Sequence, residues 1–135
     1  MQVSIGGYGG QTGTGVITVI EILGSPYCLG DGSATSCPCG NNAPAGPIPS
    51  GCVNSTMGAA TLVAQGDASA GGSTVLLIAA GAVPSLPGVF FSGENQVGGG
   101  AGVAFGDGLR CAGFNAKRLQ VTASDGNGNA LTTVD

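Results

Sequence analysis

Apolar residues along this chain gather in short runs that are typical of β-strands. Residues 14–23 are rich in β-branched side chains, and both alternating faces of the run are largely apolar, so a strand here expects cover on both sides. The runs at residues 73–80 and 88–92 predict two more strands, whereas residues 58–64 fit either a short strand or half a helix turn. Residues 117–123 alternate polar and apolar side chains, as a half-buried strand does.

The segments between these runs carry turn-forming residues. Residues 1–13 are Gly-rich and polar and predict a flexible arm. Residues 24–56 combine Gly, Pro, Asn and Ser with four cysteines and predict a loop region held by disulfides. Residues 93–108 predict a Gly-rich loop. The string Asp125-Gly126-Asn127-Gly128 indicates a hairpin turn, with residues 129–134 as the returning strand.

These patterns predict an all-β fold: a small antiparallel β sandwich or jelly-roll-like domain with a disulfide-stapled loop region and a Gly-rich N-terminal arm. We expect residues 1–13 to form the arm, residues 14–24 an N-terminal strand available for exchange with a neighbouring subunit, and residues 25–135 the β domain. The stretch at residues 68–93 is uncharged and long enough for a membrane span, but Pro84 and Pro87 interrupt it. Two buried strands therefore fit this stretch better than a membrane-spanning helix.

Composition narrows the classes of function. Only 7% of the residues are charged and the net charge is −4, so the chain lacks the many cations that a nucleic-acid partner requires. So few charges favour a surface that is hidden in an assembly or under glycan. The chain has no histidine, which is the commonest general base and metal ligand, and it carries no nucleophile elbow, P-loop or dinucleotide motif. We therefore expect neither enzyme activity nor a cofactor.

Five cysteines give the strongest chemical signal in the chain. Without histidine they favour disulfides, and disulfides favour an extracellular or cell-surface location. The close spacing of Cys37 and Cys39 predicts that each pairs outward, to Cys28 and Cys52, and that Cys111 is left unpaired and buried or linked to another chain. The rival interpretation, a four-thiolate metal site, lacks the Cys-x-x-Cys knuckles that such sites use.

Four further residues are candidates for binding or modification. Asp31 and Asp107 lie in a repeated Gly-Asp-Gly tripeptide, and Asp125 begins a string that matches the first half of a calcium loop. Calcium is therefore the ion to consider, although Asp, Asn and Gly are also the ordinary residues of turns. Asn54 begins an Asn-Ser-Thr glycosylation sequon.

Between residues 26 and 130 the chain carries an ordered series of motifs. They include Cys28-Leu29-Gly30-Asp31-Gly32, Cys37-Pro38-Cys39-Gly40-Asn41, Gly51-Cys52-Val53-Asn54-Ser55 and Phe105-Gly106-Asp107-Gly108-Leu109-Arg110-Cys111. This series resembles an uncharacterised cysteine-containing domain of secreted and surface proteins in planctomycete-like bacteria. The resemblance implies an extracellular β domain and no known enzyme activity. Members of that family continue into further strands, so we expect an incomplete sheet here.

The leading hypothesis is a non-catalytic structural subunit of an extracellular filament or surface assembly. Copies of the chain would be joined by donation of the N-terminal strand, and the residues expected at that joint are Val16, Ile17, Val19, Ile20, Ile22 and Leu23. The plainer interpretation makes this run the first strand of its own domain. The alternative function is an adhesive calcium- or glycan-binding module of a larger surface protein.

Overall fold

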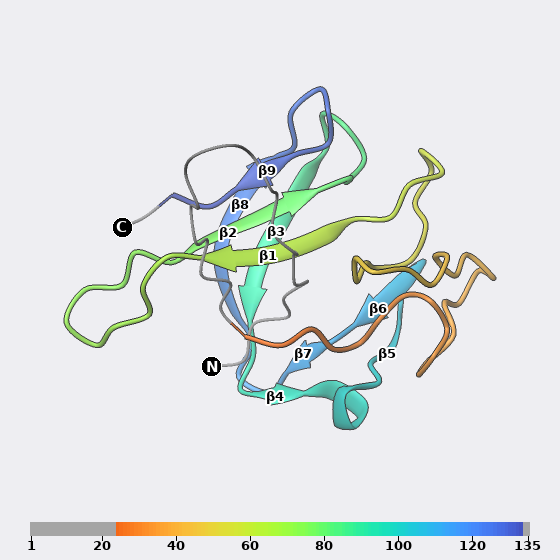
Figure 1. Ribbon diagram of the computed structural model, residues 1–135, viewed down its shortest axis with the longest axis horizontal. Coiled ribbons are helices and arrows are strands. Elements are labelled where there is room, and N and C mark those ends of the chain that lie inside the picture. Colours follow the sequence, from red (N-terminus) through yellow and green to blue (C-terminus); the bar gives the residue numbers. More distant parts are fainter. Residues whose placement is uncertain (1–23, 134–135) are drawn as a thin grey trace, which may run out of the picture.

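The computed structural model describes residues 24–133, which form an all-β fold built from several small antiparallel sheets (Figure 1). Within this range the elements are β1 (Thr61–Gln65), β2 (Leu76–Ala80), β3 (Pro87–Ser92), β4 (Asn95–Gln96), the short 3-10 helix η1 (Val97–Gly100), β5 (Val103–Phe105), β6 (Gly108–Arg110), β7 (Ala112–Gly113), β8 (Lys117–Ala123) and β9 (Ala130–Leu131). No helix in this part of the chain has the length and apolar character that crossing a membrane requires.

The largest sheet has three strands in the order β1-β2-β9. The strands β1 and β2 pair along their full length, with Val63 opposite Ile78. The strand β9 adds to the other edge of β2, where Ile78 is opposite Leu131. Both pairings are antiparallel, and β2 is therefore the central strand of the sheet.

The second layer is a two-stranded ribbon of β3 and β8, which crosses the layer of β1 and β2 in Figure 1. The two layers meet through a small core of three buried side chains, which are Ala64 on β1, Leu77 on β2 and Phe90 on β3. Half-buried apolar residues of β1, β2 and β9 pack around them. Among residues 24–133 no large side chain is fully buried, so this core is thin for the size of the chain.

Two smaller ribbons complete the described part of the chain. The strand β4 pairs with β7, and β5 pairs with β6 across the turn at Asp107. The helix η1 lies between β4 and β5, where Gly98 and Gly99 adopt positive φ angles of 63° and 65° that a side chain would disfavour.

The strand predictions are confirmed for β2, β3 and β8, and residues 58–64 contribute the strand β1 rather than a helix turn. The predicted loop at residues 93–108 instead contains β4, η1 and β5. The predicted hairpin was wrong in its pairing, because the strand after the Asp125 turn joins β2 and not β8. The predicted arm (1–13) and the predicted strand at residues 14–23 lie outside the described residues.

Candidate functional site

The cysteine region is held by two disulfides, and their pairing corrects the sequence prediction. Cys37 bonds to Cys52, and Cys28 bonds to Cys111, with Cα–Cα distances of 6.0 and 5.7 Å. Cys111, predicted to be unpaired, is therefore in a disulfide within its own chain, and Cys39, predicted to be paired, is a free and exposed thiol. The error arose because the second bond spans 83 residues and joins the loop to the segment between β6 and β7.

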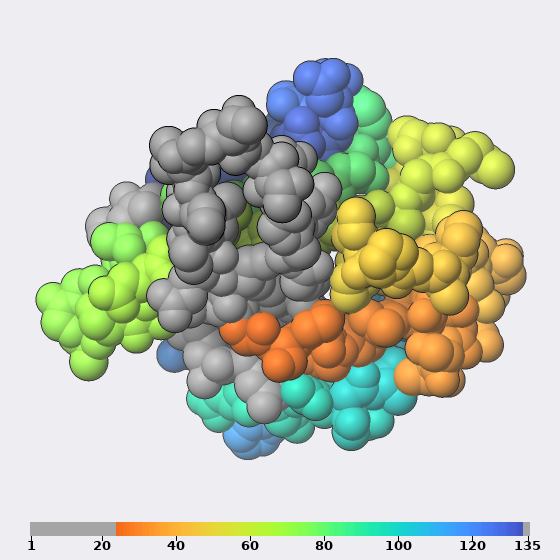
Figure 2. All heavy atoms as spheres, in the orientation of Figure 1, coloured from red at the N-terminus to blue at the C-terminus, as the bar shows by residue number. Residues whose placement is uncertain are grey.

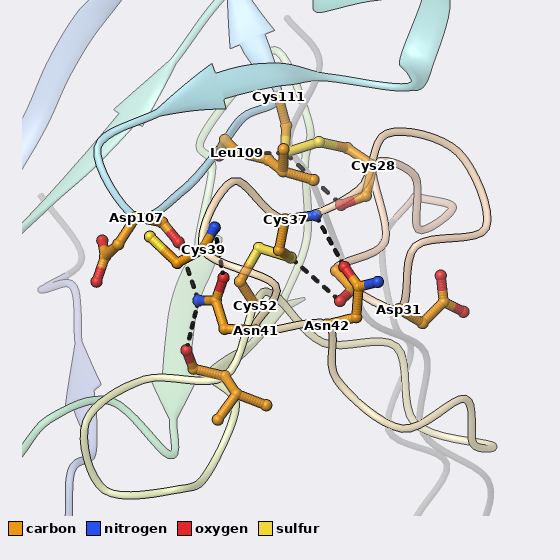
Figure 3. Close-up of a disulfide and its surroundings, with 12 residues drawn as sticks. Cys28, Asp31, Cys37, Cys39, Asn41, Asn42, Cys52, Asp107, Leu109 and Cys111 are labelled. Carbon is orange, nitrogen blue, oxygen red and sulfur yellow. Dashed lines mark hydrogen bonds between the residues drawn. A yellow bond between two sulfur atoms is a disulfide. The ribbon is translucent and has the colours of Figure 1, made fainter.

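Two asparagines organise the loop between Cys37 and Cys52 (Figure 3). The side-chain amide of Asn41 donates to the carbonyl of Val53 at 2.8 Å and to the carbonyl of Asp107 at 3.0 Å. The Oδ1 atom of Asn42 accepts the backbone N–H of Cys37 at 2.8 Å. The Asn41 contacts join this loop to the β5–β6 turn, so the region is fixed by side chains as well as by its disulfides.

Close backbone contact explains the first Gly-Asp-Gly motif. Gly30 donates its N–H to the carbonyl of Ser50 at 2.8 Å and accepts the N–H of Ala43 at 2.7 Å. A Cβ atom on Gly30 would collide with the backbone of Gly51. In Figure 2 the atoms of residues 24–56 lie next to one another on the visible face of the molecule.

The three candidate calcium ligands are not brought together. No group of three or more His, Cys, Asp or Glu residues within residues 24–133 is placed to hold a metal ion. Figure 3 shows Asp31 and Asp107 on opposite sides of the Cys37–Cys52 bond, with their carboxylates directed away from each other.

Asp31 and Asp125 instead stabilise turns. Asp31 accepts the backbone N–H of Ser33, and hydrogen bonds from Ser33 hold the pKa of Asp31 below its ordinary value. Asp125 accepts the backbone N–H groups of Asn129 and Asn127, each at 2.8 Å, and these bonds likewise lower the pKa of Asp125. Both carboxylates therefore do what the turn interpretation of their motifs expects.

The side chain of Asn54, the candidate glycosylation site, is engaged in hydrogen bonds within the chain. Its amide nitrogen donates to the carbonyl of Gly81 at 2.8 Å. Its Oδ1 atom accepts both the N–H and the hydroxyl of Thr56, at 2.9 and 2.6 Å. The nitrogen to which a glycan would be attached thus helps to connect the loop after Cys52 to the end of β2.

A cavity of about 320 Å³ lies between the two layers and the start of the cysteine region. Its lining is mainly apolar and includes Tyr27, Leu62, Leu77, Phe90 and Leu109. Burial raises the pKa of the Tyr27 phenol above its ordinary value. Sequence patterns alone did not indicate this cavity, because its walls come from six segments that are separated along the chain.

The start of β1 contributes to the wall of the cavity through Thr61 and Leu62. One edge of β1 is paired with β2, and no strand within residues 24–133 pairs with its other edge. The backbone contact at that edge precedes the strand, where Gly51 donates to the carbonyl of Ala60 at 2.8 Å. The apolar cavity and the open strand edge together form the candidate site, which we call the β1 cleft.

The fold and the site define an all-β chain with two disulfides and an apolar cleft beside an open strand edge. Comparisons of the chain with protein-family models, with curated proteins and with solved structures find no match. Any functional conclusion therefore depends on the geometry of this chain.

Proposed function

We propose that the protein is a non-catalytic structural subunit of an extracellular assembly, and that copies are joined by donation of residues 14–23 into the β1 cleft of a neighbour. The observation that carries the proposal is the thin core. Within residues 24–133 no large side chain is fully buried, yet a cavity of about 320 Å³ lies beside that core. An inserted strand would supply the missing apolar side chains.

The size and the edge of the β1 cleft suit such a strand. A dry cavity of roughly 150 Å³ holds one benzene ring, so about 320 Å³ can take roughly two or three aliphatic side chains. The open edge of β1 offers backbone hydrogen bonds to the same strand, which is how strand addition usually gains affinity. Residues 14–23 offer apolar side chains on both faces, including Ile17 and Ile20.

The two disulfides support the extracellular location, because such bonds persist in oxidising compartments. A charged fraction of 7% supports an assembled form, because a freely soluble surface normally carries more charge. Head-to-tail donation gives a contact between two different surfaces, and such contacts form filaments when they do not close into a ring.

The test compares a donor variant with a matched control. In Ile20→Asp a carboxylate enters the apolar strand, whereas Thr12→Asp adds the same charge in the Gly-rich segment before it. We expect electron microscopy and size-exclusion chromatography to show large particles for the wild type and Thr12→Asp, and a particle near 12.8 kDa for Ile20→Asp. A wild type that is itself a monomer would refute the proposal.

A peptide of residues 14–23 tests whether the β1 cleft is the acceptor for this strand. If the β1 cleft receives this strand, the peptide should bind the Ile20→Asp variant and raise its unfolding temperature. A peptide that carries the same substitution should not. Assembly that survives Ile20→Asp unchanged would place the joint elsewhere on the molecule.

A further inference from the structure

The β3–β8 ribbon turns its apolar residues outward. Val89 lies opposite Val121 in the ladder, and Phe91 lies opposite Arg118, with Leu119 as the extra residue of a β-bulge. The exposed fractions of Val89, Phe91, Leu119 and Val121 are 49%, 42%, 44% and 53%. Residues on the other side of the ribbon are more buried, notably Phe90 and Ser92.

This arrangement inverts the usual division of a half-buried strand. On β8 the polar residues Gln120 and Thr122 are partly buried, whereas Leu119 and Val121 face solvent. Pro87 and Ala123 form the next pair on the exposed side, so its central rows contain apolar residues only. A contiguous apolar patch of this kind marks an interaction surface more often than a bare surface.

The two ends of this apolar face carry opposite charges. At one end, Arg118 pairs with Phe91 and is exposed. At the other end, beyond Ala123, the exposed Asp125 receives a backbone hydrogen bond of 3.2 Å from Ser85. Arg118 lies beside residue 91 and Asp125 lies beside residue 85, so the two charges are six residues apart along the ribbon. The apolar rows lie between them.

A face with Arg118 at one end and Asp125 at the other is complementary to a second copy of itself under a two-fold axis. When two copies place these faces together with β8 antiparallel to β8, the Arg118 of each copy meets the Asp125 of the other. The axis then passes between the Val89–Val121 row and the Pro87–Ala123 row. A parallel arrangement would place like charges opposite each other. Charge therefore selects a second copy in the antiparallel orientation.

We propose that this face, which we call the β3–β8 face, is a second contact between copies of the chain, isologous and antiparallel. Val89 and Phe91 of this face also contribute to the wall of the β1 cleft, so the contact is tested in a protein that lacks strand donation. Asp125 can serve it while it stabilises its own turn, because a carboxylate has more acceptor sites than the two used within the chain. The face connects chains laterally, as a layer or a bundle of filaments requires.

The β3–β8 face is small compared with interfaces that hold stable dimers. Six residues of ribbon at about 3.4 Å each give roughly 20 Å of length, and a stable interface buries about 800 Å² on each partner. The contact is therefore weak by itself and gains strength when many copies are already connected. We expect it at high protein concentration in the unassembled variant.

Cross-linking between single cysteines tests the orientation. All proteins carry Ile20→Asp, to remove strand donation, and Cys39→Ser, to remove the free thiol. One sample mixes copies with Leu119→Cys and copies with Ser85→Cys, and a bis-maleimide that spans the roughly 10 Å between packed sheets is added. The antiparallel contact predicts mixed dimers in large excess over either homodimer, because like positions lie roughly 20 Å apart along the strands. Ser69→Cys, an exposed position in the β1–β2 loop, is the control.

Charge removal tests the same contact with a closely matched control. Arg118→Gln and Asp125→Asn should each reduce the yield of mixed dimers, roughly 2–10-fold, because each removes both symmetric ion pairs. Asp125→Asn retains the acceptor that its turn needs. Lys117→Gln removes the same charge as Arg118→Gln, but Lys117 pairs with the buried Ser92, so it should change the yield less than twofold.

Two results would overturn the second contact. Equal yields of mixed dimers and homodimers would refute the antiparallel orientation. Equal decreases in the yield of mixed dimers for Lys117→Gln and Arg118→Gln would show that net charge, and not the Arg118–Asp125 ion pair, causes the decrease. Neither result depends on strand donation, since every protein in the experiment lacks a functional donor. Assembly by the wild type with no specific cross-link would leave the proposed function standing and remove only this inference.

Discussion

The two disulfides should differ in what they contribute to stability, because they close loops of very different length. Cys37 and Cys52 are 15 residues apart, whereas Cys28 and Cys111 are 83 residues apart. If the main effect of a disulfide is to restrict the unfolded chain, the short loop contributes about 3 kcal/mol and the long loop about 4.5 kcal/mol. Either loss is a large part of the 5–15 kcal/mol that typically stabilises a domain.

The perturbation is a pair of double variants, Cys28→Ala/Cys111→Ala and Cys37→Ala/Cys52→Ala. Both carry Cys39→Ser, so that the free thiol cannot exchange with the remaining bond. The two pairs are matched in burial, since each contains one buried member, Cys28 or Cys37. A difference between the double variants therefore reports loop length more than the loss of packed sulfur.

Urea unfolding followed by circular dichroism measures the effect, with the Cys39→Ser protein as the reference. We expect both double variants to unfold at lower urea, and Cys28→Ala/Cys111→Ala to be the less stable by about 1.5 kcal/mol. Equal losses, or a larger loss for the short loop, would refute the argument from loop length. The stabilisation would then come from the packing of the buried Cys37 side chain rather than from loop closure.

Three further outcomes follow from single side chains. Phe90→Ala should cost about 3–5 kcal/mol in urea unfolding because Phe90 is the largest side chain of the buried core, whereas Phe105→Ala, at an exposed position, should cost about 0.5 kcal/mol or less. Asp125 has a lowered pKa in the folded chain, so its contribution to stability is complete above the pKa of the unfolded chain and is lost as pH falls through the pKa of the folded chain. Asp125→Asn should therefore flatten the acid limb of the curve of stability against pH, and an unchanged curve would contradict this. Without reduction, iodoacetamide should label Cys39 alone in peptide mapping by mass spectrometry, and a labelled Cys111 would refute the pairing.

Local pattern was enough to predict where the long strands lie but not how they pair. The boundaries of β8 match the predicted run at residues 117–123. The turn at Asp125 also forms, yet β9 leaves it toward β2, because contacts at residues 82–86 hold the turn. Ser124 donates its hydroxyl to the carbonyl of Val83 at 2.6 Å, and Ala82 donates its N–H to Gly128 at 3.0 Å. These contacts are distant in sequence and leave no periodic signal.

The cysteine pairing failed as a prediction for the same reason. Spacing within residues 28–52 favours bonds inside the loop, and it correctly indicates that Cys37 and Cys39 do not bond to each other. The partner of Cys28 is placed instead by the ribbons β5–β6 and β4–β7, which bring Cys111 to the loop. Thr35 supports this placement, because its hydroxyl donates to the carbonyl of Gly102 at 2.9 Å.

The alternation along β8 shows a deeper limit of pattern reasoning. Alternation of polar and apolar residues indicates that a strand has two unlike faces, but it does not indicate which face packs against the core of the same chain. On β8 the apolar face is the exposed one, and the inner layer is formed mainly by Phe90 from β3. With 7% charged residues, the chain has little means of keeping such a face in water as a monomer. The exposure of the apolar face of β8 is explained if this face packs against the same face of another copy, with Arg118 and Asp125 setting the orientation of the two copies.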